Sequence, residues 1–156
     1  MSSDNKELIY LTGIEKTKAW FEQAIPEPTI ADACVQIGCH MEEVGEMLEV
    51  TGDSGALDEV LVISNYYKQK HGNYLVDTGE IFTDKQAQTE LLDSLADQIV
   101  TAIGVAHMFG FDISGALAEV NRSNFSKFED GKPVFDANGK IAKGKNYTPP
   151  DLTPYI

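Results

Sequence analysis

Cysteine is scarce in this chain of 156 residues. The two cysteines, Cys34 and Cys39, lie five positions apart inside one predicted helix, and no CxxC pattern surrounds them. Disulfide frameworks and structural zinc sites need more cysteines at characteristic spacings. The sequence therefore argues against both kinds of site and fits a reducing compartment such as the cytoplasm.

Positive charge is also scarce, with 12 Lys and Arg against 25 Asp and Glu and a net charge of -13. Such a chain repels phosphate backbones and anionic lipids, so we expect neither nucleic acid nor a membrane as its partner. The longest apolar run, residues 99–111, contains Thr101, Gly104 and His107 and is too short to span a bilayer. The opening MSSDNKELIY lacks the basic and apolar regions of a secretory signal, so we expect a cytoplasmic protein.

Histidine patterns that bind metals are missing as well. His40 precedes a group of glutamates without forming HExxH, and His107 stands alone in an apolar segment. A ferritin-like di-iron bundle needs ExxH motifs on two helices, and the chain contains no ExxH. We therefore interpret both histidines as structural, and the sequence argues against the di-iron class.

Helical periodicity is the main feature that the chain does contain. Its composition, 42% hydrophobic and 24% charged, is typical of a soluble globular protein, and we predict one all-α domain spanning residues 1–156. We expect four to five helices, the second capped by Thr29 or Asp32 and the last by Asp112 or Ser114. The predicted bounds are Ile14–Ala24, Thr29 or Asp32 to Val50, Ala56–Lys70, Lys85–Phe109 and Gly115–Phe128.

The remaining segments are predicted to be irregular. They comprise an N-terminal segment (1–13), the connection Asn73–Asp84 and a C-terminal tail (129–156). Within the tail, DGKPVFDANGK predicts a small hairpin around Asn138-Gly139. The closing YTPPDLTPYI is expected to be extended because proline disfavours helix.

Two predicted helices carry stacked carboxylates. In HMEEVGEMLE (40–49), Glu43 and Glu46 share one helical face, as do Glu42 and Glu46. In ELLDSLAD (90–97), Asp93 and Asp97 are one turn apart, and the helix continues as an apolar segment that we expect to be buried. Either these carboxylates are simply solvated, or the two helices form one acidic pocket filled by divalent cations. Oxygen-only ligands suit Mg²⁺ or Mn²⁺.

The cationic residues gather near the other end of the chain. Six of the twelve fall between positions 122 and 145, namely Arg122, Lys127, Lys132, Lys140, Lys143 and Lys145. They either keep a loose tail soluble or bring positive charge to a polyanionic ligand. Trp20, the only tryptophan, is either a core anchor or a base-stacking or pocket-wall residue.

These motifs together resemble a known superfamily. EEVGE (42–46) matches the EExxE signature, and ELLDSLAD resembles the second metal motif, of the all-α nucleoside triphosphate pyrophosphohydrolases, which include MazG, the dimeric dUTPases and phosphoribosyl-ATP pyrophosphohydrolase. That second motif is usually ExxD. The chain matches ExxD literally at Glu90 and Asp93, but we align the final Asp with Asp97, which places Ser94 at the glutamate position and Asp93 one residue earlier.

The C-terminal part of the chain strengthens the resemblance. EVNRSNFSKF (119–128) and DGKPVFDANGKIAKGKNYTPPDL (130–152) are similar to the end of MazG-like proteins of phage and bacterial type. The resemblance covers most of the chain from about Trp20 onward. It implies a helical bundle completed by homo-oligomerisation, as a homodimer or homotetramer, and a host-cytoplasmic location if the chain is phage-encoded.

The implied activity is hydrolysis of nucleoside triphosphates between the α- and β-phosphates, which yields a monophosphate and pyrophosphate. The implied cofactor is Mg²⁺, for which Mn²⁺ can substitute. Its implied ligands are Glu43, Glu46, Asp97 and either Asp93 or Glu90. Glu42 or Glu46 is expected to accept the proton of the attacking water, and the sequence does not choose between them.

The substrate-binding residues are expected toward the C-terminus. Asn121, Asn124 and Lys127 lie at three-residue spacing and are predicted to share one helical face, with Lys127 directed at the β- and γ-phosphates. Arg122 is the second candidate for phosphate, or else bridges subunits. Lys143, Lys145 and Tyr147 are expected in a tail that folds over the nucleotide.

Three functions follow as alternatives. The first is hydrolysis of (deoxy)nucleoside triphosphates, weakly favouring dGTP or another purine deoxynucleotide. The second is a dUTP or dCTP pyrophosphatase of the same superfamily. The third, from another class, is a non-catalytic acidic bundle that serves as an interaction module.

Overall fold

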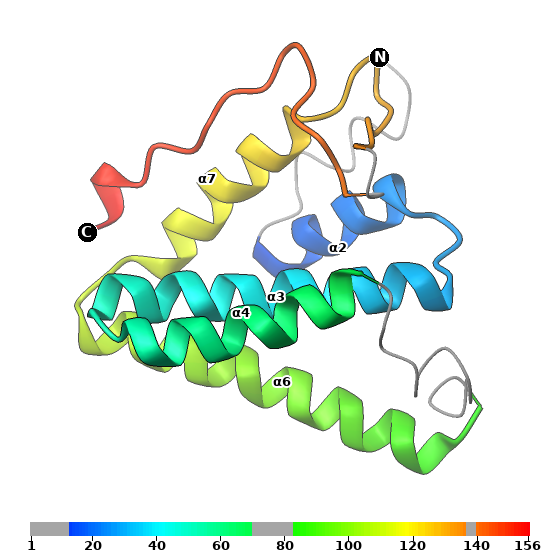
Figure 1. Cartoon of the computed structure of the whole chain (residues 1–156). Helices are drawn as coiled ribbons and strands as arrows, with labels where there is room; N and C mark the ends of the chain where they lie inside the picture. Colours follow the sequence, from blue (N-terminus) through cyan, green and yellow to red (C-terminus); the bar gives the residue numbers. More distant parts are fainter. Residues whose placement is uncertain (1–12, 70–82, 137–139) are drawn as a thin grey trace. The chain divides into compact units, whose positions relative to one another are not determined.

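The computed structural model describes residues 13–69, 83–136 and 140–156. Five α-helices and no strand occur in these ranges, which confirms the all-α prediction (Figure 1). Most of the predicted connection Asn73–Asp84, the hairpin turn at Asn138-Gly139 and nearly all of the N-terminal segment lie outside the described residues. The helices are α2 (Gly13–Ala24), α3 (Ile30–Thr51), α4 (Ser54–Lys68), α6 (Lys85–Met108) and α7 (Ile113–Phe125), and a short 3₁₀ helix, η2, spans Thr153–Tyr155.

The chain divides into two compact units. Unit 1 runs to Pro26 and resumes at Asp93, so it contains α2, α7 and the C-terminal tail, whereas unit 2, Glu27–Leu92, contains α3 and α4. α6 crosses the boundary between the units. The single domain, the MazG-like bundle and its oligomerisation stay predictions.

α3 begins at a capping box that uses both of the predicted residues. Thr29 Oγ1 accepts the backbone N–H of Asp32 at 3.2 Å, and Asp32 Oδ2 accepts the backbone N–H of Thr29 at 2.9 Å. α3 ends at Gly52, whose φ of 86° lies in the left-handed region that glycine adopts without strain. Asp53 then accepts the N–H of Ala56 at 3.0 Å and caps α4, which starts this helix ahead of the predicted bound.

α3 and α4 pack closely because glycines face their contact. A Cβ on Gly38 would lie 2.7 Å from the carbonyl oxygen of Ser64 and 2.9 Å from the backbone nitrogen of Lys68. A Cβ on Gly45 would lie 3.2 Å from Leu57 Cδ1. Ser64 Oγ donates a buried hydrogen bond of 2.8 Å to the Gly38 carbonyl. Unit 2 is therefore a helical hairpin whose backbones approach at glycine positions (Figure 1).

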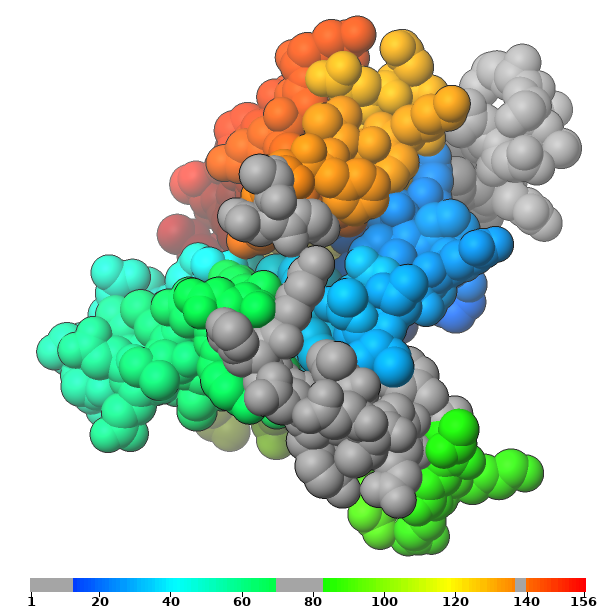
Figure 2. Space-filling model, turned by 45° about the vertical axis from the view of Figure 1, so that its right-hand side comes forward, coloured from blue at the N-terminus to red at the C-terminus, as the bar shows by residue number. Residues whose placement is uncertain are grey.

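α2 and α7 pack around an aromatic core in unit 1. The Trp20 side chain is 6% exposed and stacks on Phe128, with ring centroids 5.8 Å apart and planes 10° apart. Gln23 Nε2 donates to the carbonyl of Gly131 at 2.8 Å, so the segment after α7 also contacts α2. Figure 2 shows this segment, in orange, against the blue α2. The buried core comprises Trp20, Ala24 and Phe128, and the partly buried Phe21, Ile25, Phe125 and Ile141 surround it.

α7 starts and ends earlier than the sequence predicts. Asp112, one of the two predicted caps, accepts the N–H of Gly115 at 3.0 Å. The helix ends at Phe125 with Ser126 as its C-cap, although the prediction continued to Phe128. The chain turns at this point because Phe128 packs on Trp20, a tertiary contact that local helix propensity does not reveal.

The tail contains more local structure than the sequence predicts. The N–H of Asp136 donates to the Lys140 carbonyl at 2.9 Å, and the N–H of Ala142 donates to the Val134 carbonyl at 2.7 Å. These bonds pair the two sides of the predicted hairpin. The extended conformation predicted for the last residues is wrong at Thr153–Tyr155, which form η2 because proline is tolerated in a first helical turn.

α6 exposes apolar side chains that the sequence predicts to be buried. Val100, Ile103 and Met108 are 65%, 46% and 81% exposed, and Ala106 is the one buried residue described for α6. Within unit 1, the part of α6 from Asp93 onward packs against neither α2 nor α7. Within unit 1, the burial predicted for this segment is not found, because no helix of unit 1 covers it.

Among the described residues, no single helix is long and apolar enough to span a membrane. α6 and α7 reach that length and apolar composition only when taken together, and they are bent by 117° relative to each other.

Candidate functional site

α3 separates its glutamates into two environments. Glu43, Glu46 and Glu49 are exposed, whereas Glu42 is partly buried against α4. Lys68 Nζ lies 2.6 Å from Glu42 Oε2, and about a quarter of each side chain is exposed, at 21% and 28%. The first glutamate of EEVGE is therefore ion-paired within unit 2, and the side chains of Glu43 and Glu46 are exposed.

Sequence reasoning missed Lys68 as a partner of the glutamate cluster. Lys68 is the last residue of α4, and the short link at Gly52 and Asp53 folds α4 back along α3. Two helices joined by such a link place residues near the end of the second opposite residues near the middle of the first. The positions of Glu42 before this link and of Lys68 after it were the sequence signal that could have identified the pair.

The acidic part of α6 is fully exposed. Glu90 Oε1 accepts a hydrogen bond from Gln86 Nε2 one turn earlier, at 2.7 Å. Asp93 and Asp97 are exposed and lie one turn apart on the same helix, as their spacing predicts. Their carboxylates are therefore accessible on a continuous helix, which is what a ligand-binding role requires.

The predicted metal ligands fall in different units. Glu43 and Glu46 belong to unit 2, whereas Asp93 and Asp97 belong to unit 1. Among the described residues, no three or more His, Cys, Asp or Glu side chains form a group able to hold a metal ion. The donors themselves, all carboxylates, are those that Mg²⁺ prefers. The chemistry of the donor set thus fits Mg²⁺, and the pairing of the two acidic helices stays a prediction.

The predicted polar face of α7 is only partly present. Asn121 is 1% exposed, and its Oδ1 accepts from Thr17 Oγ1 at 2.9 Å while its Nδ2 donates to the Gly13 carbonyl at 3.1 Å. Asn124 is half-buried on the same helix. Lys127 follows the end of α7, so the shared helical face predicted for these residues does not reach it. The Asn121 amide ties α2 to α7, which is a structural role that the sequence did not reveal.

Trp20 and Lys127 lie together in unit 1. The Nζ of Lys127 lies 5.8 Å from the centroid of the Trp20 ring, within the range of a cation–π interaction. The indole Nε1 is buried and has no hydrogen-bond partner among the described residues. Trp20 is therefore a core anchor, one of the two roles left open by the sequence, and Phe128 stacks on its ring.

Arg122 binds the chain's own tail. Its guanidinium forms two hydrogen bonds to the carboxylate of Glu119, at 2.6 and 2.8 Å. It also donates to Thr148 Oγ1 at 2.5 Å and to the Pro149 carbonyl at 2.9 Å. Arg122 was predicted either to contact phosphate or to bridge subunits, and its observed contacts join α7 to the tail.

The turn at residues 143–147 places two predicted residues together. Lys143 Nζ lies 5.0 Å from the centroid of the Tyr147 ring. A Cβ on Gly144 would lie 2.5 Å from the carbonyl oxygen of Lys127, so only glycine fits this approach. The backbone N–H of Lys145 donates to Glu129 Oε1 at 2.6 Å. Sequence reasoning missed Gly144, which fixes the turn against the residues that follow α7.

The predicted site residues thus do not form one described group. The carboxylates lie on α3 in unit 2 and on α6 in unit 1, whereas Lys127, beside Trp20, and the pair Lys143 and Tyr147 lie elsewhere in unit 1. Comparison of the chain with protein-family models, curated proteins and solved structures gives no match.

Proposed function

We propose that this protein hydrolyses nucleoside triphosphates between the α- and β-phosphates and releases a nucleoside monophosphate and pyrophosphate. The observation that carries the proposal is the position of EEVGE on one continuous helix, where Glu43 and Glu46 are exposed one turn apart. The resemblance of EEVGE, ELLDSLAD and NRSNFSKF to the MazG-like superfamily supports the same activity.

The proposed cofactor is Mg²⁺, held by Glu43 and Glu46 of α3 and by Asp93 and Asp97 of α6. When bound, Mg²⁺ neutralises the triphosphate and lowers the pKa of bound water. Stacked carboxylates repel each other and a polyanionic substrate, so their exposure on both helices is consistent with a site completed by cations. Mn²⁺ is the proposed substitute because it accepts the same oxygen ligands.

Of the two candidates for the proton acceptor, the contacts of unit 2 favour Glu46. Glu42 Oε2 is engaged by Lys68 at 2.6 Å, which holds its side chain toward α4. Glu46 is exposed on α3 and open to water. We therefore assign the proton-accepting role to Glu46 and a positioning role to Glu42.

The phosphate-binding role is proposed for Lys127 and Lys143. The ammonium group of Lys127 lies over the ring of Trp20, and that of Lys143 lies over the ring of Tyr147. One side of each positive charge therefore faces an aromatic ring and not water. A polyanion binds more strongly to cations in such surroundings than to fully solvated ones. The chain's net charge of -13 makes this local group important for attracting a triphosphate.

We further propose that the active form is a homodimer or homotetramer in the cytoplasm. The exposed apolar side chains of α6 support this proposal because an uncovered apolar helix is unfavourable in water. The α6 helix of a second copy of the chain would cover them. The carboxylates of α6 would then lie at the interface between the two copies.

The substrate is proposed to be a free deoxynucleoside triphosphate, with a weak preference for a purine such as dGTP. A dUTP or dCTP pyrophosphatase is the alternative within the superfamily. The non-catalytic acidic bundle is favoured by one observation, the solvent exposure of Glu43, Glu46 and Glu49, since a purely solvated face has the same appearance.

Product analysis distinguishes these functions. The protein is incubated with Mg²⁺ and each of the eight common nucleoside triphosphates, and the products are separated by ion-exchange chromatography. Monophosphate and pyrophosphate from one or a few substrates would support the proposal and identify the base. No product from any of them, with Mg²⁺ or Mn²⁺, would favour the non-catalytic bundle.

A further inference from the structure

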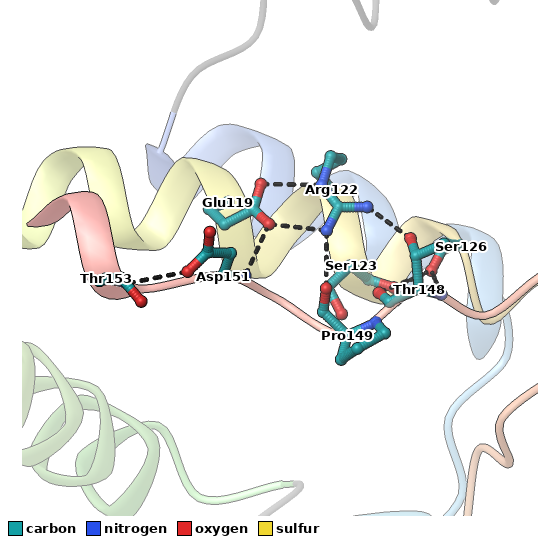
Figure 3. Close-up of polar contacts among 8 residues, drawn as sticks. All are labelled: Glu119, Arg122, Ser123, Ser126, Thr148, Pro149, Asp151 and Thr153. Carbon is teal, nitrogen blue, oxygen red and sulfur yellow. Dashed lines mark hydrogen bonds and ion pairs between the residues drawn. The ribbon is translucent and has the colours of Figure 1, made fainter.

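The end of the tail runs antiparallel to α7 over the whole length of the helix. The N–H of Thr148 donates to Ser126 Oγ at 2.9 Å, beside the C-terminal end of α7. The N–H of Asp151 donates to Glu119 Oε1 at 3.0 Å near its middle. The N–H of Asp112, at its N-terminal end, donates to the Tyr155 carbonyl at 2.9 Å. We call residues 148–155 the strap (Figure 3).

Glu119 and Arg122 are the centre of this arrangement. The guanidinium uses four hydrogen bonds, two to Glu119 and one each to Thr148 and Pro149. Figure 3 shows both side chains between α7 and the strap. Hydrogen bonds from the Arg122 side chain and from the Asp151 backbone lower the pKa of Glu119 to about 2. The pair therefore stays charged at neutral pH.

The strap is continuous with the turn that carries two of the proposed substrate-binding residues. Tyr147 immediately precedes Thr148, and the N–H of Tyr147 donates to the Gly144 carbonyl at 3.0 Å. Gly144 in turn packs on the carbonyl of Lys127. The strap is thus connected through Tyr147 and Gly144 to the segment that carries Lys143 and to the backbone of Lys127.

We infer that Glu119 and Arg122 form a latch that docks the strap on α7, and that Arg122 acts as a positioning residue for Lys143 and Tyr147 without contacting phosphate. The effect on substrate affinity rests on the proposed function, whereas docking of the strap does not. A carboxylate beside a phosphate-binding arginine would weaken anion binding. If the arginine instead docks the strap, the same carboxylate is required, because it binds both the guanidinium and the N–H of Asp151.

The Glu119→Gln variant separates these two roles because it keeps Arg122 and removes one negative charge. If Arg122 contacts phosphate, the variant should bind triphosphate more tightly. If the pair is a latch, the amides of Thr148 and Asp151 should exchange with deuterium about tenfold faster or more in the nucleotide-free protein. The KM for triphosphate should then rise by about threefold or more, with kcat held within about twofold.

Two further variants sharpen the test. Arg122→Lys keeps the positive charge but cannot form the planar fork, so it should loosen the same amides. Glu22→Gln breaks the Lys18–Glu22 ion pair on α2 of the same unit and should change neither readout. Unchanged amide protection in Glu119→Gln, or a lower KM, would overturn the latch. If even the wild-type protein hydrolyses no nucleotide, the proposed function fails and amide exchange alone still decides the latch.

Discussion

The two acidic helices of this protein differ in the exposure of the residues on their packing faces. α3 buries small residues, with Gly38 and Gly45 facing α4 so closely that a side chain on Gly38 would overlap backbone atoms. α6 exposes large residues such as Leu92 and Val100, and a Cβ on its Gly104 would meet no atom within 4 Å. α3 therefore has its packing partner within unit 2, whereas no helix of unit 1 covers the apolar side chains of α6.

Paired substitutions on α3 and α6 test whether both helices serve one site. Glu46→Gln and Asp97→Asn each remove one carboxylate charge while keeping the shape of the side chain. Both should lower kcat for triphosphate hydrolysis by at least about a hundredfold, with the fold intact or stabilised because repulsion between carboxylates is relieved. Steady-state kinetics and thermal unfolding measure the two effects.

Glu49→Gln, on the same exposed side of the cluster, is the matched control and should retain activity. Equal large losses of kcat in Glu46→Gln and Asp97→Asn would show that residues of both α3 and α6 take part in hydrolysis. Full activity in either variant would remove that helix from the site.

Glycine substitutions test the difference in packing. Gly38→Ala places a methyl group within 3 Å of the backbone of α4, so we expect a loss of about 1–3 kcal/mol in the free energy of unfolding. Gly104→Ala should gain about 0.5–1 kcal/mol because alanine has the higher helix propensity. Urea denaturation gives both values. A loss in Gly104→Ala would instead show that a partner approaches α6 at this position.

Valine substitutions test whether the exposed surface of α6 is covered in solution. Val100→Lys places a charge on α6 and should weaken self-association, raising the dimer dissociation constant by about tenfold or more. Val62→Lys, on α4, is the matched control because Val62 is 70% exposed and Val100 65%. Sedimentation equilibrium measures both. Equal behaviour of the two variants would argue against α6 as the interface.

The smallest expected effect concerns the strap on α7. Because the pKa of Glu119 falls from 4.5 to about 2 in the folded protein, its contribution to docking is complete above pH 4.5 and is lost as the pH falls toward 2. The NMR shift of the Asp151 amide should therefore titrate with a midpoint near 2. A midpoint near 4.5 would show that Glu119 is not engaged by Arg122.

The helices were predictable because their signals are local. Thr29, one of the two predicted caps, caps α3 in a box completed by Asp32, and Gly52 ends the helix as a left-handed cap. The end of α7 was not predictable, since NFSKF contains no helix breaker and the chain turns only because Phe128 packs on Trp20. Long-range contacts of this kind override local propensity.

The candidate site divides in the same way. The stacking of Glu43 on Glu46 follows from helical periodicity, and exposure of both agrees with a role in binding. Glu119 lies one turn from Arg122 on α7, so this partner could have been predicted from helical spacing. Thr148 reaches Arg122 only through tertiary folding, and Lys68 reaches Glu42 through the link between α3 and α4. The sequence offered Arg122 as a second phosphate-binding residue or as a bridge between subunits, and the structure shows it bound to the strap.

Phosphorus NMR of a reaction containing the protein, Mg²⁺ and dGTP tests the central claim most directly. The account predicts that the triphosphate signals are replaced by those of dGMP and pyrophosphate, and that this change is absent when Asp97→Asn replaces the wild-type protein. Signals of dGDP and inorganic phosphate would contradict cleavage between the α- and β-phosphates. Identical products from the Asp97→Asn variant would contradict the assignment of the site.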